Sequence, residues 1–274
     1  MVRQILSFVD NAEESAPFLE NLVAAAEHRD AHVQLGVLTA APMLIPALAP
    51  LATLYLPEAI LATDNELQVS RIRTRLAGAA KRVDIWGLHD SVGWLSADIR
   101  DTWHLADLTL IGPPDTWLTP WLRRRVAETL LVSSGTPVVL MPDAQPFPRV
   151  GHAVLGWKPS AESCRVVHDL IALAEPGAQI DVATVGPEPQ ILPGDELPGS
   201  GIEAYLKRHG FSVAMHRFDD GGATSDQLQA FTRARCADLL AVGGYAHSRA
   251  RETLLGGVTR SIVEDPFVPV LMAH

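Results

Sequence analysis

The sequence predicts an α/β protein built from two similar domains, each an open, parallel, five-stranded, Rossmann-like sheet with helices on both faces. Three observations support this fold class. Short apolar runs alternate with segments of helical periodicity, glycines follow several of these runs, and the whole pattern occurs twice along the chain. Strands that alternate with helices indicate a parallel sheet with right-handed crossovers.

The second half of the chain repeats the first. The tripeptide Ala106–Leu108 returns as Ala237–Leu239, and Gly112 corresponds to Gly243. Longer segments match in the same order: Arg3–Asp10 with Gly151–Lys158, Ala31–Thr39 with Ala178–Gly186, and Ala106–Asp143 with Ala237–His274. Several matches in one order argue for duplication, so the sequence predicts one domain over residues 1–146 and a second over residues 147–274.

Apolar, β-branched runs with little alternation predict the strands, because strands covered on both faces lack a polar side. In chain order these runs are Ile5–Val9, Val33–Leu38, Leu108–Ile111 and Val138–Met141, then Ala153–Leu155, Ile180–Val185, Leu239–Val242 and Val270–Met272, with weaker strands near Val83–Trp86 and Val213–His216. Helical spacing follows the first strand of each domain, at Phe18, Leu19, Leu22, Val23 and Ala26, and at Val166, Val167, Leu170, Ile171 and Ala174. Ligands bind such sheets at the carboxyl ends of the strands, where Gly112 and Gly243 fall.

Composition indicates an ordinary soluble globular protein, with 47% apolar and 20% charged residues. The net charge of −10 argues against nonspecific binding to nucleic acid or to an anionic membrane. Cys164 and Cys236, one per domain, are expected to be reduced, buried thiols of a cytoplasmic protein. No signal peptide is predicted, because residues 2–10 have a strand pattern.

Residues 40–62 are apolar enough to raise the question of a membrane span. Their prolines are too frequent for a spanning helix, so no membrane segment is predicted; they are Pro42, Pro46, Pro50 and Pro57. Two interpretations of this segment stay open. It packs on the domain itself, or it forms an apolar lining for a ligand or a dimer contact.

The segment Ala237–Val263 contains the most informative motif. An apolar run stops at Gly243-Gly244, a polar loop follows, and Gly256-Gly257 opens a new helix. Glycine has no Cβ, so such a strand–loop–helix arrangement lets backbone N–H groups approach a phosphate. The same glycines are also compatible with a plain strand end and a loose helix entry.

At these residues the chain resembles the universal stress protein family in its tandem, two-domain form, over nearly its whole length. In that family a loop of pattern G-x2-G-x9-G-[ST] holds the phosphates and ribose of ATP, and an aspartate at the end of the first strand contacts the nucleotide. The resemblance places Gly243, Ala246, Gly256 and Gly257 at the loop positions of the second domain. The spacing matches, but alanine replaces the second glycine and glycine replaces the final serine or threonine.

The resemblance implies a partial nucleotide site in the second domain, for ATP or AMP. Lys158 stands where the family has its aspartate, and Trp157 beside it offers either a stacking face or a core aromatic ring. The rest of the expected site consists of the strand-end residues Val185 and Val242, of Val258 and Thr259, and of His247 and Arg249 as phosphate contacts.

The first domain has the opposite combination. Asp10 matches the family's strand-end aspartate and Gly112 its first loop glycine, but prolines and Arg123–Arg125 occupy the rest of the loop. Prolines lack N–H donors, so this site is expected to be vestigial and not to bind ATP. The arginines fit either an anion-binding cluster or a helix start with ion pairs.

The residue patterns do not argue for catalysis, because the sequence has neither a spacing typical of metal ligands nor a G-x-S-x-G nucleophile motif. The sequence therefore predicts a non-enzymatic, cytoplasmic stress-response protein without a metal. Its two domains are expected to pair through Thr136–Asp143 and Phe267–His274, and a homodimer is a further option. An interaction module that has lost nucleotide binding is the alternative, and a slow ATP hydrolase using Glu252 is a third hypothesis.

Overall fold

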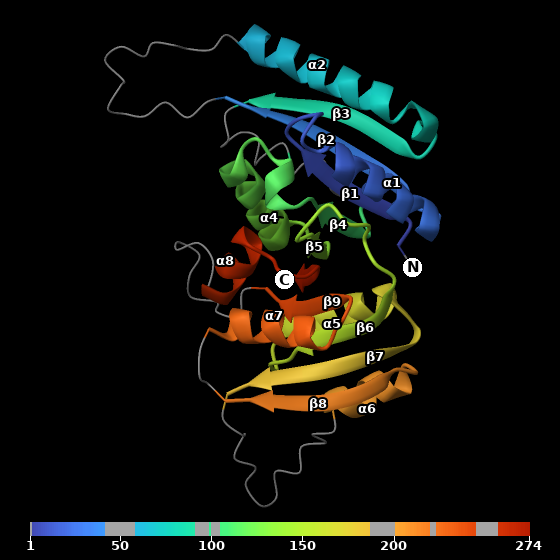
Figure 1. The fold of residues 1–274 in the computed structure, drawn as a ribbon, viewed down its shortest axis with the longest axis vertical. Helices are drawn as coiled ribbons and strands as arrows, with labels where there is room; N and C mark the ends of the chain where they lie inside the picture. Colours follow the sequence, from blue (N-terminus) through green and yellow to red (C-terminus); the bar gives the residue numbers. More distant parts are fainter. Residues whose placement is uncertain are drawn as a thin grey trace, which may run out of the picture. The chain divides into compact units, whose positions relative to one another are not determined.

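The computed structural model describes residues 2–41, 58–90, 99, 105–186, 201–219, 223–244 and 257–274, and for residues 257–259 the backbone alone. Strands and helices alternate along both halves of the chain (Figure 1). Contacts divide the chain into two compact units. Residues 2–136 with 143–146 form the first unit, and residues 137–142 with 147–274 form the second.

The first unit is a parallel sheet with the strand order β3-β2-β1-β4. Its elements in chain order are β1 (Gln4–Val9), α1 (Ala16–Arg29), β2 (His32–Ala40), α2 (Glu58–Arg75), the 3-10 helix η2 (Ala77–Ala79), β3 (Val83–Asp90), β4 (Leu108–Ile111), the 3-10 helix η3 (Pro114–Thr116) and α4 (Pro120–Ser133). In the central strand β1, both Phe8 and Val9 are fully buried. Consecutive buried residues mean that both faces of the strand are covered, which explains its unbroken apolar run.

The second unit has the strand order β5-β10-β9-β6-β7-β8. Its elements in chain order are β5 (Val138–Leu140), β6 (Val150–Gly156), α5 (Ala161–Leu173), β7 (Ala174–Val185), α6 (Gly201–Arg208), β8 (Ser212–Phe218), α7 (Thr224–Ala234), β9 (Leu239–Gly243), α8 (Gly257–Glu264) and β10 (Val270–Ala273). Its strands pair in parallel, except that β5 runs antiparallel to β10 with Leu140 opposite Val270.

The predicted Rossmann-like α/β fold class is confirmed, and each predicted apolar run forms a strand. The weaker runs near Val83 and Val213 are β3 and β8, which end the strand orders of their units. Both contain several exposed or half-buried residues, so their sequences are less uniformly apolar. The domain boundary after residue 146 and the pairing of whole domains stay predictions.

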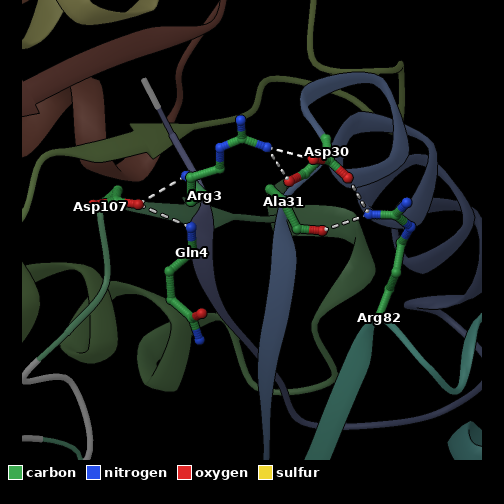
Figure 2. Close-up of polar contacts among 6 residues, drawn as sticks. All are labelled: Arg3, Gln4, Asp30, Ala31, Arg82 and Asp107. Carbon is green, nitrogen blue, oxygen red and sulfur yellow. Dashed lines mark hydrogen bonds and ion pairs between the residues drawn. The ribbon is translucent and has the colours of Figure 1, made fainter.

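One hydrogen-bonding arrangement occurs in both units, at the amino ends of the strands. The Asp107 carboxylate, which precedes β4, accepts hydrogen bonds from the backbone N–H groups of Arg3 at 2.8 Å and Gln4 at 2.9 Å (Figure 2). Asp238, which precedes β9, accepts from two β6 N–H groups at 2.9 Å each. Each aspartate thereby ties the start of one strand to its neighbour, as the sequence repeat would require.

A cluster of opposite charges joins the amino ends of β1, β2 and β3. Asp30 has φ of 50° and ends α1, and its carboxylate accepts hydrogen bonds from Arg3 and Arg82 (Figure 2). The hydrogen bond from Arg3, followed by that from Arg82, holds the pKa of Asp30 below its ordinary value. In the second unit Gly177, with φ of 79°, takes the corresponding position in the repeat. These contacts lie at the edge of the sheet opposite the carboxyl ends.

The cysteines differ from the expectation. Both are free, but Cys164 and Cys236 are exposed, not buried. Cys164 lies on the outer face of α5, and Cys236 follows α7 in the left-handed region with φ of 51°. The apolar residues near each cysteine in the sequence therefore wrongly predicted that the cysteine is buried. Within the part of the chain that the structure describes, the helices are too short or too polar to cross a membrane.

Candidate functional site

The candidate site lies in the second unit, at the carboxyl ends of β6 and β9. These strands are neighbours in the sheet, with Gly156 paired to Val242. Trp157 and Lys158 follow β6, Gly243 ends β9 and Gly244 follows it, so the structure brings these two parts of the predicted site to one edge. Val185 ends β7, the next strand along, and completes this edge.

Close packing explains why glycine occurs at Gly243. A Cβ at this position would lie 2.9 Å from the backbone nitrogen of Ser163 and 3.0 Å from the carbonyl carbon of Glu162. The start of α5 therefore lies directly against the end of β9. The next residue, Gly244, donates its N–H to the Ala273 carbonyl at 2.8 Å, so β10 uses this donor. Both glycines thus serve the packing of the fold, which was one of the two interpretations of the sequence.

The turn between β6 and α5 contains the predicted site residues Trp157 and Lys158. Ser160 caps α5 by accepting a hydrogen bond from the Ser163 N–H at 3.1 Å. Trp157 is half-buried and its backbone N–H donates to the Ala183 carbonyl at 2.8 Å. Lys158 is exposed, and it makes no hydrogen bond or ion pair with the described residues. Its ammonium is therefore a cation that this edge offers to an anion.

An acidic side chain also lies at this edge. A hydrogen bond from its own backbone N–H lowers the pKa of Glu162 below the ordinary value, against a smaller opposing effect of burial. The Ser160 hydroxyl and the nearby imidazole of His274 lower the pKa further. Glu162 is therefore a carboxylate at neutral pH. Its negative charge disfavours a phosphate beside it, whereas Lys158 favours one.

Part of the predicted loop falls outside the described residues: Ala246, His247, Arg249 and Gly256. Gly257, Val258 and Thr259 form the first residues of α8, and only their backbone is described. Val242 is 5% exposed and belongs to the core as much as to the edge. The described portion of the site is therefore the strand-end half, not the loop.

In the first unit, the corresponding aspartate is used by the fold. The Asp10 carboxylate accepts hydrogen bonds from the backbone N–H groups of Leu118 at 3.0 Å and Thr119 at 2.8 Å. Asn11 donates to Asp10 at 3.0 Å and to the Thr116 carbonyl at 3.2 Å. The aspartate therefore anchors the loop that leads into α4.

Arginine side chains complete this arrangement. Arg123 is 2% exposed, and its Nε donates to the Gly112 carbonyl at 2.8 Å. Arg124 pairs with Glu128 at 2.7 Å, and Arg125 lies 3.9 Å from the same carboxylate. Of the two interpretations offered for these arginines, the ion-pair cluster agrees with the contacts of Arg124 and Arg125. Neither interpretation included a buried arginine such as Arg123.

The sequence analysis missed a charged cluster in the second unit. The fully buried carboxylate of Asp181 on β7 accepts hydrogen bonds from Arg235 at 2.7 Å, His152 at 2.9 Å and Gln179 at 3.1 Å, and His216 lies 3.3 Å away. Burial alone would raise the pKa of Asp181, but these donors together outweigh it and hold the pKa well below its usual range.

The available signal for this cluster was a polar pair, Gln179 and Asp181, next to the apolar residues Ile180 and Val182. Its partners come from four separate segments, so their convergence could not be inferred from sequence order. Among the described residues, no group of three or more histidine, cysteine, aspartate or glutamate side chains is arranged to hold a metal ion.

Comparison with solved structures shows which known proteins share this fold. The two units define a chain of two Rossmann-like halves, and solved universal stress protein structures share this architecture. One from Archaeoglobus fulgidus aligns over 98% of this chain and 95% of its own, with a TM-score of 0.58 and 16% identity. A functionally unknown protein from Pseudomonas aeruginosa aligns over 99% and 92%, with a TM-score of 0.55 and 15% identity. No protein-family model and no curated protein matches the sequence.

At this level of identity the likeness concerns the fold. The chain has the fold of the universal stress proteins over nearly its whole length, and the predicted resemblance is confirmed to that extent.

Proposed function

We propose that the chain is a cytoplasmic universal stress protein of the tandem type, without enzymatic activity, whose second unit binds an adenine nucleotide weakly. The observation that supports this most is the contrast between the two carboxyl edges. In the first unit Asp10 and Arg123 are bonded to the fold itself. In the second unit Lys158 is exposed beside the Gly243-Gly244 strand end.

The proposed binding mode assigns each described group a role. Lys158 attracts the phosphates, and Trp157, a half-buried residue directly after β6, offers an aromatic face to the nucleotide. Val185 at the end of β7 supplies an apolar contact for the base. The Glu162 carboxylate opposes the phosphates, and the Gly244 N–H is already used by Ala273, so the affinity is expected to be weak.

Calorimetric titration with ATP and AMP tests this proposal. Lys158→Ala should weaken ATP binding about tenfold, because it removes one charge-assisted contact to phosphate. Lys207→Ala is the matched control, since it removes an exposed lysine that pairs with Glu203 on α6. Equal losses in both variants would contradict a specific contact of Lys158.

Mass spectrometry of small molecules released from the purified, denatured protein provides the second test. ATP or AMP from the wild type, and its absence from Gly256→Arg, would support a nucleotide site in the second unit. A folded protein that releases nothing, and gives no heat with added ATP, would contradict nucleotide binding.

The alternative is an interaction module that has lost nucleotide binding. The carboxylate of Glu162 at the edge and the packing of Ser163 against Gly243 favour it, because both reduce the room and the charge available to a phosphate. This alternative predicts that Gly256→Arg leaves stability and partner binding unchanged. A slow ATP hydrolase would need Glu252 as its base, a residue outside the described part of the chain.

A further inference from the structure

Among the described strands, β3 forms one edge of the first unit's sheet, and a groove lies beside it. β3 ends the strand order, and α2 packs along β2 and β3 (Figure 1). Two open cavities, of about 490 Å³ and about 430 Å³, lie between α2 and β3, and Arg73 lines both of them. We call this feature the β3 groove; it extends over residues 83–89 of β3.

The backbone of β3 presents hydrogen-bonding groups to this groove. The carbonyls of Arg82 and Asp90 accept hydrogen bonds from the β2 side, at 2.7 Å and 2.9 Å. Backbone groups alternate in direction along a strand, so the odd-numbered residues between them direct N–H and C=O outward. Arg73 confirms this direction, because its Nη2 donates to the Ile85 carbonyl at 2.8 Å.

The wall of the groove is shaped around a glycine. Asn65 on α2 is 3% exposed, and its amide donates to the carbonyls of Val37 at 2.8 Å and Leu88 at 3.2 Å. A Cβ on Gly87 would lie 1.7 Å from the Asn65 Oδ1, so only glycine fits beneath it. The space above Gly87 is thus filled by Asn65 and Val69 of α2, which lie directly against the β3 backbone.

We propose that this edge is the interface with a second copy of the chain, in which the two β3 strands pair antiparallel about a two-fold axis at Trp86. In this register Ile85 lies opposite Gly87 of the second copy, and the two residues exchange N–H···O bonds. The Ile85 side chain then lies beside a residue without a side chain of its own, so no pair of side chains clashes at this point. Asp84 lies opposite Leu88, so no like charges meet directly across the strands.

The helices fit the same arrangement. Neighbouring strands are about 4.8 Å apart, and α2 lies over β2 and β3, so the two α2 axes would be about 10 Å apart. That spacing is the ordinary packing distance of two helices. Pairing of the strands therefore also brings the two α2 helices into contact, antiparallel to one another.

Charge complementarity supports a second copy as the occupant. Arg73 lies beside Ile85, and Glu66 lines the cavity beside Gly87. Since the register places Ile85 opposite Gly87, each Arg73 faces Glu66 of the second copy. When the strands pair, the Ile85 carbonyl exchanges its hydrogen bond from Arg73 for one from the Gly87 N–H of the second copy. A symmetric contact of this kind is self-complementary, as an isologous dimer requires.

Analytical ultracentrifugation of the full chain, from micromolar to millimolar concentration, tests the proposal. The wild type should form a reversible dimer. Arg73→Glu should weaken dimerisation about tenfold or more, because two ion pairs become two repulsions. The double variant Glu66→Arg with Arg73→Glu should restore it. Arg71→Glu is the control: it changes the same charge on the same helix, but Arg71 contacts Glu13 at 3.5 Å.

Two results would overturn the interface, and a third would overturn its register. A wild type that stays monomeric at millimolar concentration excludes it, and so does a dimer that Arg73→Glu leaves intact. A dimer that is lost in Arg73→Glu and not recovered in the double variant excludes the register. Circular dichroism of each variant establishes that it is folded. The proposal is independent of the nucleotide site, since the β3 groove lies in the other unit.

Discussion

The carboxyl edges of the two units follow one backbone plan and differ in what their side chains do. In the first unit the strand-end carboxylate of Asp10 anchors the loop before α4, and Arg123 is buried beneath that loop. In the second unit Lys158 stands at the equivalent position and is exposed. A polar group at a strand end can therefore serve the chain itself or remain available to a ligand, and its hydrogen bonds distinguish the two cases.

The loop sequence explains why the first edge is closed. Pro113 and Pro114 give this segment few N–H donors, and those of Leu118 and Thr119 are bonded to Asp10. A phosphate would therefore have to displace a carboxylate from these donors. Such an exchange gains no hydrogen bond at these N–H groups and leaves the Asp10 carboxylate without them, so it is not favoured. In the first unit, these polar groups are bonded to one another and stabilise the fold. In a binding site, some of them would have to be left for the ligand.

The largest expected effect concerns Arg123. Arg123→Ala should lower the free energy of unfolding by about 3 kcal/mol, because it removes a buried hydrogen bond to Gly112 and leaves a cavity. Arg125→Ala, whose side chain is 45% exposed, should change it by less than about 0.5 kcal/mol. Urea unfolding followed by tryptophan fluorescence measures both. Equal effects would mean that the burial of Arg123 does not stabilise the first edge.

The comparison of Asp10 with Lys158 gives the next effect. Asp10→Ala should cost about 2 kcal/mol of stability, since the N–H groups of Leu118 and Thr119 lose a charged acceptor. Asp10→Asn, which keeps one oxygen, should cost less. Lys158→Ala should leave the unfolding midpoint almost unchanged, because this side chain is exposed. A destabilised Lys158→Ala would show that the second edge is also closed by its own residues.

Sequence alone predicted the strands well. Each apolar run formed a strand, and Gly112 and Gly243 fall at carboxyl ends of strands, because buried parallel strands have a distinctive pattern. The chemistry of the two edges was harder to predict. Arginine is rarely fully buried, so the run Arg123–Arg125 indicated a solvated or paired surface, and the buried member of the run was not foreseen.

Contacts between distant segments account for the rest of what was missed. Asp181 attracts His152, His216 and Arg235 across three strands and the end of a helix, and no local spacing encodes that meeting. The cysteines show the converse. Cys164 occurs among apolar helical residues, yet it lies on the outer face of α5, because burial depends on the helix face and not on the nearest neighbours.

The two strand-end glycines provide a smaller and sharper comparison. Gly243→Ala should cost about 1 to 2 kcal/mol, because its Cβ would meet the backbone of α5 at Ser163, which cannot move alone. Gly112→Ala should cost less, since its Cβ would meet side-chain atoms of Thr116 and Phe18, which can shift. Thermal unfolding of both variants measures the difference. The reverse order would mean that α5 yields more easily than the first unit's loop.

The smallest effect concerns the acidic group at the second edge. Because the folded state lowers the pKa of Glu162 below its ordinary 4.5, the ionised carboxylate stabilises the fold above that pH, and this contribution is lost as pH falls through the folded pKa. Glu162 is only partly buried, so solvent screening limits the contribution to a few tenths of a kcal/mol at about neutral pH. Glu162→Gln should flatten the acid side of the stability profile by that amount.

The same substitution should strengthen ATP binding about threefold at pH 7, since it removes a negative charge beside the proposed phosphates. Calorimetric titration of Glu162→Gln beside the wild type measures this change. Glu203→Gln on α6 serves as the control, because it removes one negative charge from an exposed pair with Lys207. If Glu162→Gln leaves the affinity for ATP unchanged, the phosphates do not bind near the start of α5. The nucleotide site would then lie elsewhere on the second unit.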